Sequence, residues 1–227
     1  MNLALAPMLS PYGVVWSSIA AYLLGSIPFG KLLLADRYAD RSGPAIRLPR
    51  NSHSSAETEI VSRRGNGLAA RPLAILLDAA KGYLAVWLAS HVSQANIHWM
   101  MIAGLSAILG DIAPIWLRFR GGRGVATGAG TFLAICWPAV ALAFSLWLVV
   151  LWFWDYLSLA SISAAAALPM LIYVLYAPGH APPEIVSFNT MFAAVLVIMG
   201  YKTNIQRLLA GTEPRFRMGR LKNDSNG

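Results

Sequence analysis

Long apolar segments alternate with short polar ones along most of this chain. Seven apolar segments can be drawn, and a helix needs roughly 20 residues to cross the hydrocarbon core of a bilayer. They cover residues 14–34, 73–89, 100–117, 125–135, 138–154, 157–175 and 186–201. The pattern predicts an all-α, polytopic membrane bundle with about seven transmembrane helices. The fourth segment is too short for a straight span, so we expect it to be tilted, broken or packed inside the bundle.

Composition and charge support a membrane protein. Of the 227 residues, 57% are hydrophobic and only 12% are charged, against about 25% in an ordinary soluble domain. The net charge of +8 raises the possibility of nucleic-acid binding, but the basic residues flank the apolar segments. This distribution excludes nucleic acid as a partner. The single cysteine, Cys136, excludes an intrachain disulfide and a cysteine metal cluster.

The basic residues also predict the orientation. All of the 18 Lys and Arg residues except Lys81 fall in three regions. These are the first loop, the connection between the third and fourth segments, and the tail. With seven crossings, all three regions lie on the side that the positive-inside rule makes cytoplasmic. We therefore expect an external N-terminus, a cytoplasmic C-terminus, one membrane-embedded domain over residues 1–217 and a flexible tail over residues 218–227.

The segment RFRGGRGVATGAG, residues 118–130, is the most specific candidate site. Its arginines bind phosphate through a planar fork, and its glycines let backbone N–H groups approach an anion. It then enters a helix start, which favours anions. The pattern predicts a phosphate site at the membrane surface. The alternative is a basic turn that anchors the fourth helix to anionic lipid headgroups. The candidate residues are Arg120, Gly121, Gly122, Arg123, Gly124 and Thr127.

Three charged residues stand within apolar helices. Asp78 and Lys81 are three residues apart and can meet on one helix face, either as a structural ion pair or as part of a substrate cleft. Asp111 lies seven residues before Arg118. We expect it to pair with one of the nearby arginines, although it also qualifies as a general base.

Two further regions carry polar candidates. After the seventh segment, Lys202 and Gln206 share a helix face, and Asn204 can donate and accept hydrogen bonds. This region is either a basic juxtamembrane helix on anionic lipid or a further wall of the phosphate site. The first loop supplies Ser52, His53, Arg63 and Arg64. A nucleophile assisted by His53 is disfavoured, because no elbow motif is present.

Several segments together resemble the bacterial acyl-phosphate:glycerol-3-phosphate acyltransferases. The resemblance covers most of the chain and is carried by AYLLGSIPFGKLL, LLDAAKG, GLSAILGDIAPIWLRFRGGRGVATGAG, YLSLASIS and TNIQRLLAGTE. It implies a seven-helix enzyme of the bacterial inner membrane that moves an acyl group from acyl phosphate to the 1-hydroxyl of glycerol 3-phosphate. The products are lysophosphatidic acid and phosphate. It implies no metal or other cofactor, and we expect a monomer in membrane lipid.

The resemblance also assigns roles to residues. Ser52, Arg123 and Asn204 are implied to be catalytic. Arg63, Arg64, Arg120, Gly121, Gly122, Gly124 and Lys202 are implied to bind phosphate, with Asp78, Lys81, Asp111 and Thr127 in support.

The chain departs from the family pattern at four places. The glycine-rich first motif is replaced by NSHSSAETEIVSRRG, and Arg123 stands where a lysine is usual. Gly110-Asp111 stands where Gly-His is usual, and Lys202 replaces a histidine. Two alternatives therefore stay open, a catalytically silent paralogue that binds a phosphorylated lipid or partner, and a small anion or lipid transporter.

Overall fold

The computed structural model describes residues 11–30, 70–119, 121–175 and 183–216, and the regular structure within them is helical. The chain divides into two compact units, Met1–Ile135 and Cys136–Gly227. The prediction of a single domain over residues 1–217 stays a prediction, and the expected tail lies outside the described residues.

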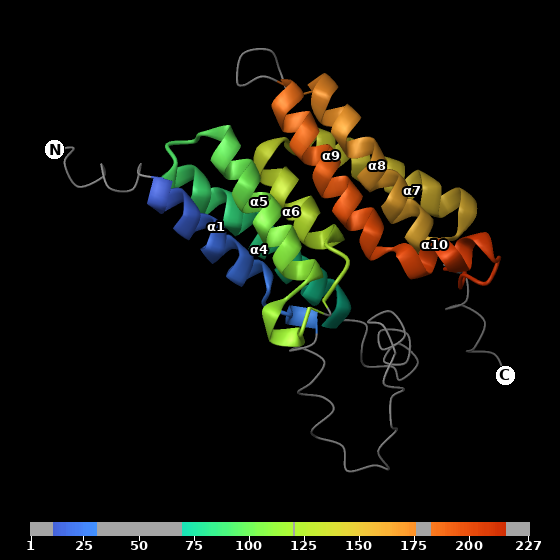
Figure 1. Cartoon of the computed structure of the whole chain (residues 1–227). Helices are drawn as coiled ribbons and strands as arrows, with labels where there is room; N and C mark the ends of the chain where they lie inside the picture. The colour runs from blue at the N-terminus through green and yellow to red at the C-terminus, as the bar shows by residue number, and fades with distance from the viewer. Residues whose placement is uncertain (1–10, 31–69, 120, 176–182, 217–227) are drawn as a thin grey trace, which may run out of the picture. The chain divides into compact units, whose positions relative to one another are not determined.

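The described residues of unit 1 form four α-helices and a short 3-10 helix. α4 packs against α6 and α5, and α1 packs against α5 and α4 (Figure 1). The helices begin and end as follows: α1 Pro11–Gly25, α4 Ala70–Val92, α5 Ile97–Ile112, the 3-10 helix η2 Ile115–Leu117, and α6 Val125–Ile135.

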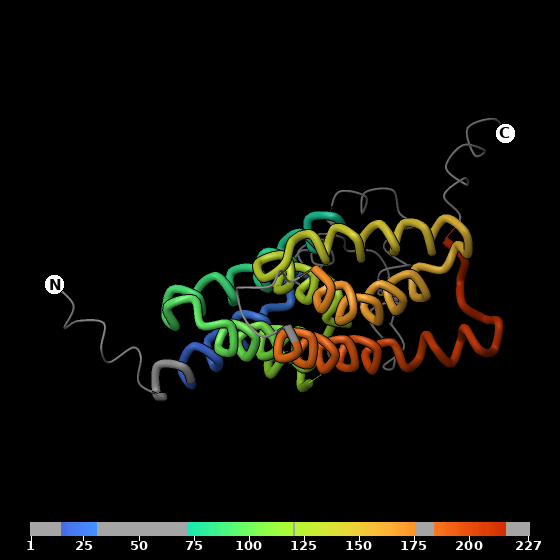
Figure 2. Tube along the Cα trace, turned by 90° about the horizontal axis from the view of Figure 1, so that it is seen from above, coloured from blue at the N-terminus to red at the C-terminus, as the bar shows by residue number. Residues whose placement is uncertain are grey.

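In the part of unit 2 that the structure describes there are three long helices and one short one. They are α7 Trp137–Trp154, α8 Leu157–Leu175, α9 Pro183–Gly200 and α10 Lys202–Leu209. α8 packs against both α7 and α9, and the three run lengthwise side by side in both views (Figures 1 and 2). α10 turns away from α9 by 63°.

Each of the seven apolar segments contains a described helix, and α6 and α8 have the expected bounds. Two of the predicted helices were longer than the observed ones. The first segment was expected to reach Leu34, but α1 ends at Gly25, three residues before Pro28. The third was expected to be continuous to Leu117, but α5 ends at Ile112 and η2 follows. Pro114 explains this break, because a proline disfavours the helical conformation of the residue before it.

Four described segments are long and apolar enough to cross a membrane: Pro72–Val92, Ile97–Leu117, Trp137–Trp154 and Leu157–Leu175. A fifth joins the bent pair Glu184–Gly200 and Lys202–Leu209. Val15–Gly25 and Val125–Ile135 are shorter apolar helices. These findings make the chain a multi-pass helical membrane protein, as expected.

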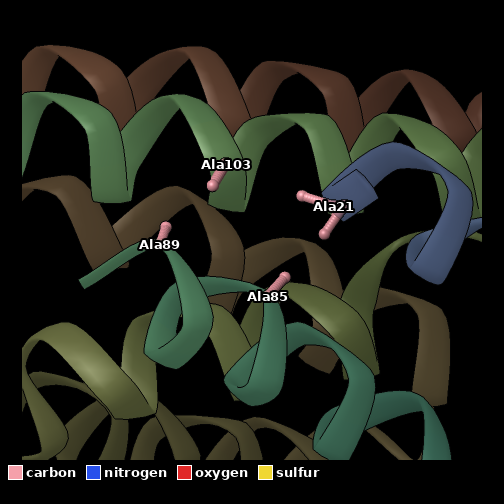
Figure 3. Close-up of a cluster of buried hydrophobic side chains, with 5 residues drawn as sticks. Ala21, Ala85, Ala89 and Ala103 are labelled. Atoms are coloured by element: carbon pink, nitrogen blue, oxygen red, sulfur yellow. The ribbon is translucent and has the colours of Figure 1, made fainter. Parts of the chain in front are cut away.

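Small side chains form the centre of unit 1. Ala21 of α1, Ala85 and Ala89 of α4, and Ala103 and Ala107 of α5 make one buried cluster. In Figure 3 the methyl groups of Ala85 and Ala89 point towards Ala21 and Ala103. Alanine lets helix backbones come close, which is how helices associate in lipid, where apolar burial supplies little driving force.

Glycines bring α4 and α6 still closer together. A Cβ added to Gly82 would lie 2.1 Å from the carbonyl oxygen of Thr127, and one added to Gly130 would lie 1.8 Å from that of Ala79. Thr127, Gly128, Gly130, Thr131 and Phe132 of α6 are buried. Of the three arrangements expected for the short fourth segment, packing inside the bundle is therefore the one observed.

Two glycines of α6 allow a matched test of this contact. We expect Gly130→Ala to destabilise the protein by about 1–3 kcal/mol, because the new methyl group overlaps the backbone of α4. Gly128→Ala places its Cβ 3.7 Å from Ile108 Cδ1, an ordinary contact, and should leave stability unchanged or raise it by up to about 1 kcal/mol. Thermal unfolding in detergent measures both. Equal melting temperatures for the two variants would contradict the packing.

Candidate functional site

A buried lysine joins three parts of unit 1. The side chain of Lys81, on α4, is 1% exposed. Its Nζ lies 2.8 Å from Asp78 Oδ1 and 2.6 Å from Asp111 Oδ1, and it donates to the carbonyl oxygen of Ile27 over 3.1 Å. Asp111 Oδ1 and the Ile27 carbonyl oxygen accept hydrogen bonds from this ammonium group, and Asp78 adds a second negative charge beside it as an ion pair. The predicted ion pair between Asp78 and Lys81 is confirmed.

Asp111, at the C-terminal end of α5, connects this lysine to the glycine-rich turn. Its Oδ1 binds Lys81, and its Oδ2 accepts a hydrogen bond from the N–H of Gly124 over 3.0 Å. Its carbonyl oxygen accepts from the N–H of Gly122 over 2.8 Å, and that of Ile112 accepts from Gly121 over 3.1 Å. Asp111 therefore holds the turn through its side chain and its backbone.

The turn approaches α5 too closely for larger residues. A Cβ on Gly121 would lie 2.1 Å from the carbonyl oxygen of Asp111, and one on Gly122 would lie 2.7 Å from Asp111 Oδ2. Gly124 adopts a φ of +75°, which residues with a Cβ rarely tolerate. These glycines are needed because the turn folds back onto the end of α5.

The N–H groups of the glycines in this turn bond to acceptors within the chain. The sequence predicted that Gly121, Gly122 and Gly124 direct these groups at a phosphate, but here they donate to Asp111 and Ile112. The physical reason is that the turn folds back onto the end of α5. The carboxylate of Asp111 accepts from Gly124 at the start of α6, where the helix dipole favours an anion, and backbone carbonyl oxygens at the end of α5 accept from Gly121 and Gly122. Their role as phosphate donors stays a prediction.

Lys81 binds the carboxylate of Asp111, a partner that the sequence did not predict, and the expected pairing of Asp111 with a nearby arginine stays a prediction. Both carboxylate oxygens are bonded within the chain, which does not favour a role as general base.

The other predicted residues of this segment lie around the turn. Arg123 is half-buried between the exposed Gly122 and the buried Gly124, and it makes an interaction within the chain. Arg118 is exposed. Thr127 is fully buried, and its hydroxyl has no hydrogen-bond partner among the described residues. Ser52, Arg63, Arg64 and Arg120 lie outside the described residues.

Unit 2 holds a second polar cluster, around Asn204. This side chain is buried on α10, and its Nδ2 donates to Glu213 Oε1 over 2.7 Å. The other carboxylate oxygen of Glu213 lies 3.1 Å from Arg207 Nε. Asn204 Oδ1 has no hydrogen-bond partner among the described residues, so it remains an available acceptor. Lys202 and Gln206 are both exposed on α10, as their predicted common face requires.

Comparison with known proteins decides the family. A family model described as glycerol-3-phosphate acyltransferase matches residues 15–211. This chain belongs to the glycerol-3-phosphate acyltransferase family. A relative of that name from Mesorhizobium japonicum is 39% identical over 202 residues, which is 89% of this chain and 95% of the relative. A second, from Burkholderia thailandensis, is 34% identical over 213 residues, covering 93% and 99%.

Solved structures of PlsY, described as an integral membrane glycerol 3-phosphate acyltransferase, share the fold of this family member. The glycerol 3-phosphate form aligns with a TM-score of 0.76 and 29% identity, over 92% of this chain and 98% of that one. The lysophosphatidic acid form aligns with a TM-score of 0.72 and 28% identity, over 89% and 95%. The resemblance inferred from the sequence motifs is confirmed.

One residue at the polar cluster of this glycerol-3-phosphate acyltransferase family member was missed. Glu213 received no role from the sequence, yet it binds both Asn204 and Arg207. Glu213 comes two residues after Gly211, which has a φ of +68° just after α10. A glycine at this position marks the end of a helix and lets the chain turn back. An acidic residue soon after such a glycine, with Arg207 in the last turn of the helix, was the signal that could have identified Glu213.

The role of Glu213 can be tested by truncation. We expect Glu213→Ala to cost about 1.5–3 kcal/mol, because Asn204 loses a charged hydrogen-bond partner and Arg207 loses its ion pair. Glu184→Ala, at an exposed position in the first turn of α9, is the matched control and should cost less than about 1 kcal/mol. Thermal unfolding compares the two. A melting temperature for Glu213→Ala no lower than that of the control would refute the role.

Proposed function

We propose that this protein transfers a fatty acyl group from acyl phosphate to the 1-hydroxyl of glycerol 3-phosphate. The products are lysophosphatidic acid and inorganic phosphate, so the reaction belongs to phospholipid biosynthesis. The observation that carries the proposal is the family match over residues 15–211, which includes the glycine-rich turn and Asn204. One of the similar structures is described as a glycerol 3-phosphate form, which supports the acceptor. The acyl phosphate donor follows from the sequence motifs.

The proposed reaction needs little covalent chemistry from the protein. The hydroxyl oxygen of glycerol 3-phosphate forms an ester bond to the acyl carbon, and the bond from that carbon to the phosphate oxygen breaks. Phosphate leaves, and the proton of the hydroxyl group passes to the leaving phosphate. Because the acyl group is already activated, positioning and charge stabilisation supply the rate. No protein nucleophile is required.

The residues take the following proposed roles. Arg123 binds a substrate phosphate through its guanidinium. Arg120, Lys202, Arg63 and Arg64 are further phosphate-binding residues. Asn204 offers its unpartnered Oδ1 as an acceptor for a substrate hydroxyl group. Ser52 takes a catalytic role towards the acceptor substrate. Gly121, Gly122 and Gly124 shape the turn, and Asp78, Lys81, Asp111 and Thr127 support it.

We further propose seven membrane crossings in the bacterial inner membrane, a single domain over residues 1–217 and a monomer. With the bent pair α9 and α10 counted as one span, five described segments meet the requirements of a span, and α1 and α6 supply the remaining two as shorter helices. The basic residues then lie on the cytoplasmic side, with the N-terminus outside and the C-terminus inside.

Acyl transfer by the purified protein in lipid tests the function directly. We expect palmitoyl phosphate to release phosphate only when glycerol 3-phosphate is present. Arg123→Ala should lower the rate by about 100-fold, because a charged group that stabilises phosphate is lost. Arg118→Ala, which removes an exposed arginine of the same region, should change it less than about threefold. No release by a folded sample would instead favour the silent paralogue, and phosphate uptake by proteoliposomes would favour the transporter.

The proposed orientation has a separate test, which uses single cysteines placed in a Cys136→Ala background. Gln94 lies in the turn between α4 and α5, and Thr212 lies after α10; both are exposed. In intact cells, a membrane-impermeant maleimide should label Gln94→Cys and leave Thr212→Cys unlabelled until the membrane is opened. Labelling of both cysteines, or of Thr212→Cys alone, would contradict the orientation.

A further inference from the structure

The two residues that flank Arg123 are both bonded to Asp111. The N–H of Gly122 donates to the Asp111 carbonyl oxygen over 2.8 Å, and that of Gly124 donates to its Oδ2 over 3.0 Å. We propose that Asp111, held by Lys81, is a positioning residue that fixes the turn from Gly121 to Gly124 and thereby places Arg123. This inference rests on the proposed function, in which Arg123 binds a substrate phosphate.

The contacts of Asp111 require a carboxylate. Its Oδ1 accepts from the ammonium of Lys81 while its Oδ2 accepts from the N–H of Gly124. An asparagine has only one acceptor atom, so its amide N–H groups would face one of these donors. A glutamate would add a methylene group, which moves the carboxylate away from the positions at which its two oxygens meet Lys81 and Gly124. Neither substitution reproduces the two bonds.

A structural ion pair alone does not account for this arrangement. Lys81 already binds Asp78 on its own helix and the carbonyl oxygen of Ile27, so a tether of α4 would not need the turn. The bonds from Asp111 to Gly122 and Gly124 add nothing to the neutralisation of Lys81. These bonds restrict the backbone on both sides of Arg123, at the exposed Gly122 and at the buried Gly124 just before α6.

Lys81 in turn restricts Asp111. The carboxylate of Asp111 is partly buried, and the ammonium of Lys81, which lies 2.6 Å away, compensates its charge there. The guanidinium of Arg123 can donate two parallel hydrogen bonds to a phosphate only from a narrow range of positions, so a small displacement of the turn would weaken binding. The chain of contacts therefore runs from α4 through the end of α5 to Arg123.

Kinetics provide the first part of the test. Asp111→Asn is compared with Asp155→Asn, which makes the same change at the end of α7 in unit 2. Asp155 has a φ of 57°, a conformation that asparagine also adopts. We expect Asp111→Asn to lower kcat/KM at least tenfold and to raise the KM of one phosphorylated substrate. Asp155→Asn should stay within twofold of the parent protein.

The second part of the test needs no activity. Cys136 is buried, so Cys136→Ala provides a background in which Arg123→Cys is the single thiol. Its rate of alkylation by a charged reagent reports the conformation of the turn. We expect Asp111→Asn to raise this rate at least fivefold and Asp155→Asn to leave it unchanged.

The outcomes separate the inference from the proposed function. An unchanged alkylation rate in Asp111→Asn would overturn the positioning role, even if activity falls, because the residue would then act on the reaction directly. A parent protein without acyl transfer would overturn the function, while the alkylation rates would still report on the turn. If Asp111→Asn does not fold, Gly122→Ala should give the same fivefold increase, with Gly128→Ala as its control. An unchanged rate there would also overturn the inference.

Discussion

A buried ammonium group determines much of the structure of unit 1. Removing Lys81 from water costs several kcal/mol unless oxygen atoms replace the lost hydration, and here Asp78, Asp111 and the carbonyl oxygen of Ile27 do so. These oxygens come from α4, from the end of α5 and from the segment after α1. Any arrangement that separates those three parts would leave a charge unpaired in an apolar interior.

Such short ionic contacts require that the helix backbones lie close together. The alanine cluster of α1, α4 and α5 supplies one part of this close approach, and Gly82 and Gly130 supply the other, between α4 and α6. In lipid, apolar burial gives little preference for one helix arrangement over another. We infer that the small residues permit the contact and that the ion cluster selects its register.

The sequence predicted the helices well because each long apolar run is a local signal. It also predicted the ion pair between Asp78 and Lys81, since residues three apart on a helix are neighbours. It did not predict that Lys81 would bind Asp111, thirty positions away, because no spacing rule links residues on different helices. Glu213 was missed for the same reason, as its partners Asn204 and Arg207 depend on how the chain turns back after α10.

Asp111 changes how an anion can be recognised near α6. Its carboxylate accepts from the N–H of Gly124 and its carbonyl oxygen accepts from that of Gly122, so these backbone donors are bonded within the chain. A helix start that already carries a negative charge attracts a second anion less strongly, so we infer that side-chain cations bind the phosphate instead. This gives a physical reason for an arginine at position 123, where the family pattern that the sequence resembles has lysine. Its planar fork supplies two directed donors where an ammonium supplies a point charge.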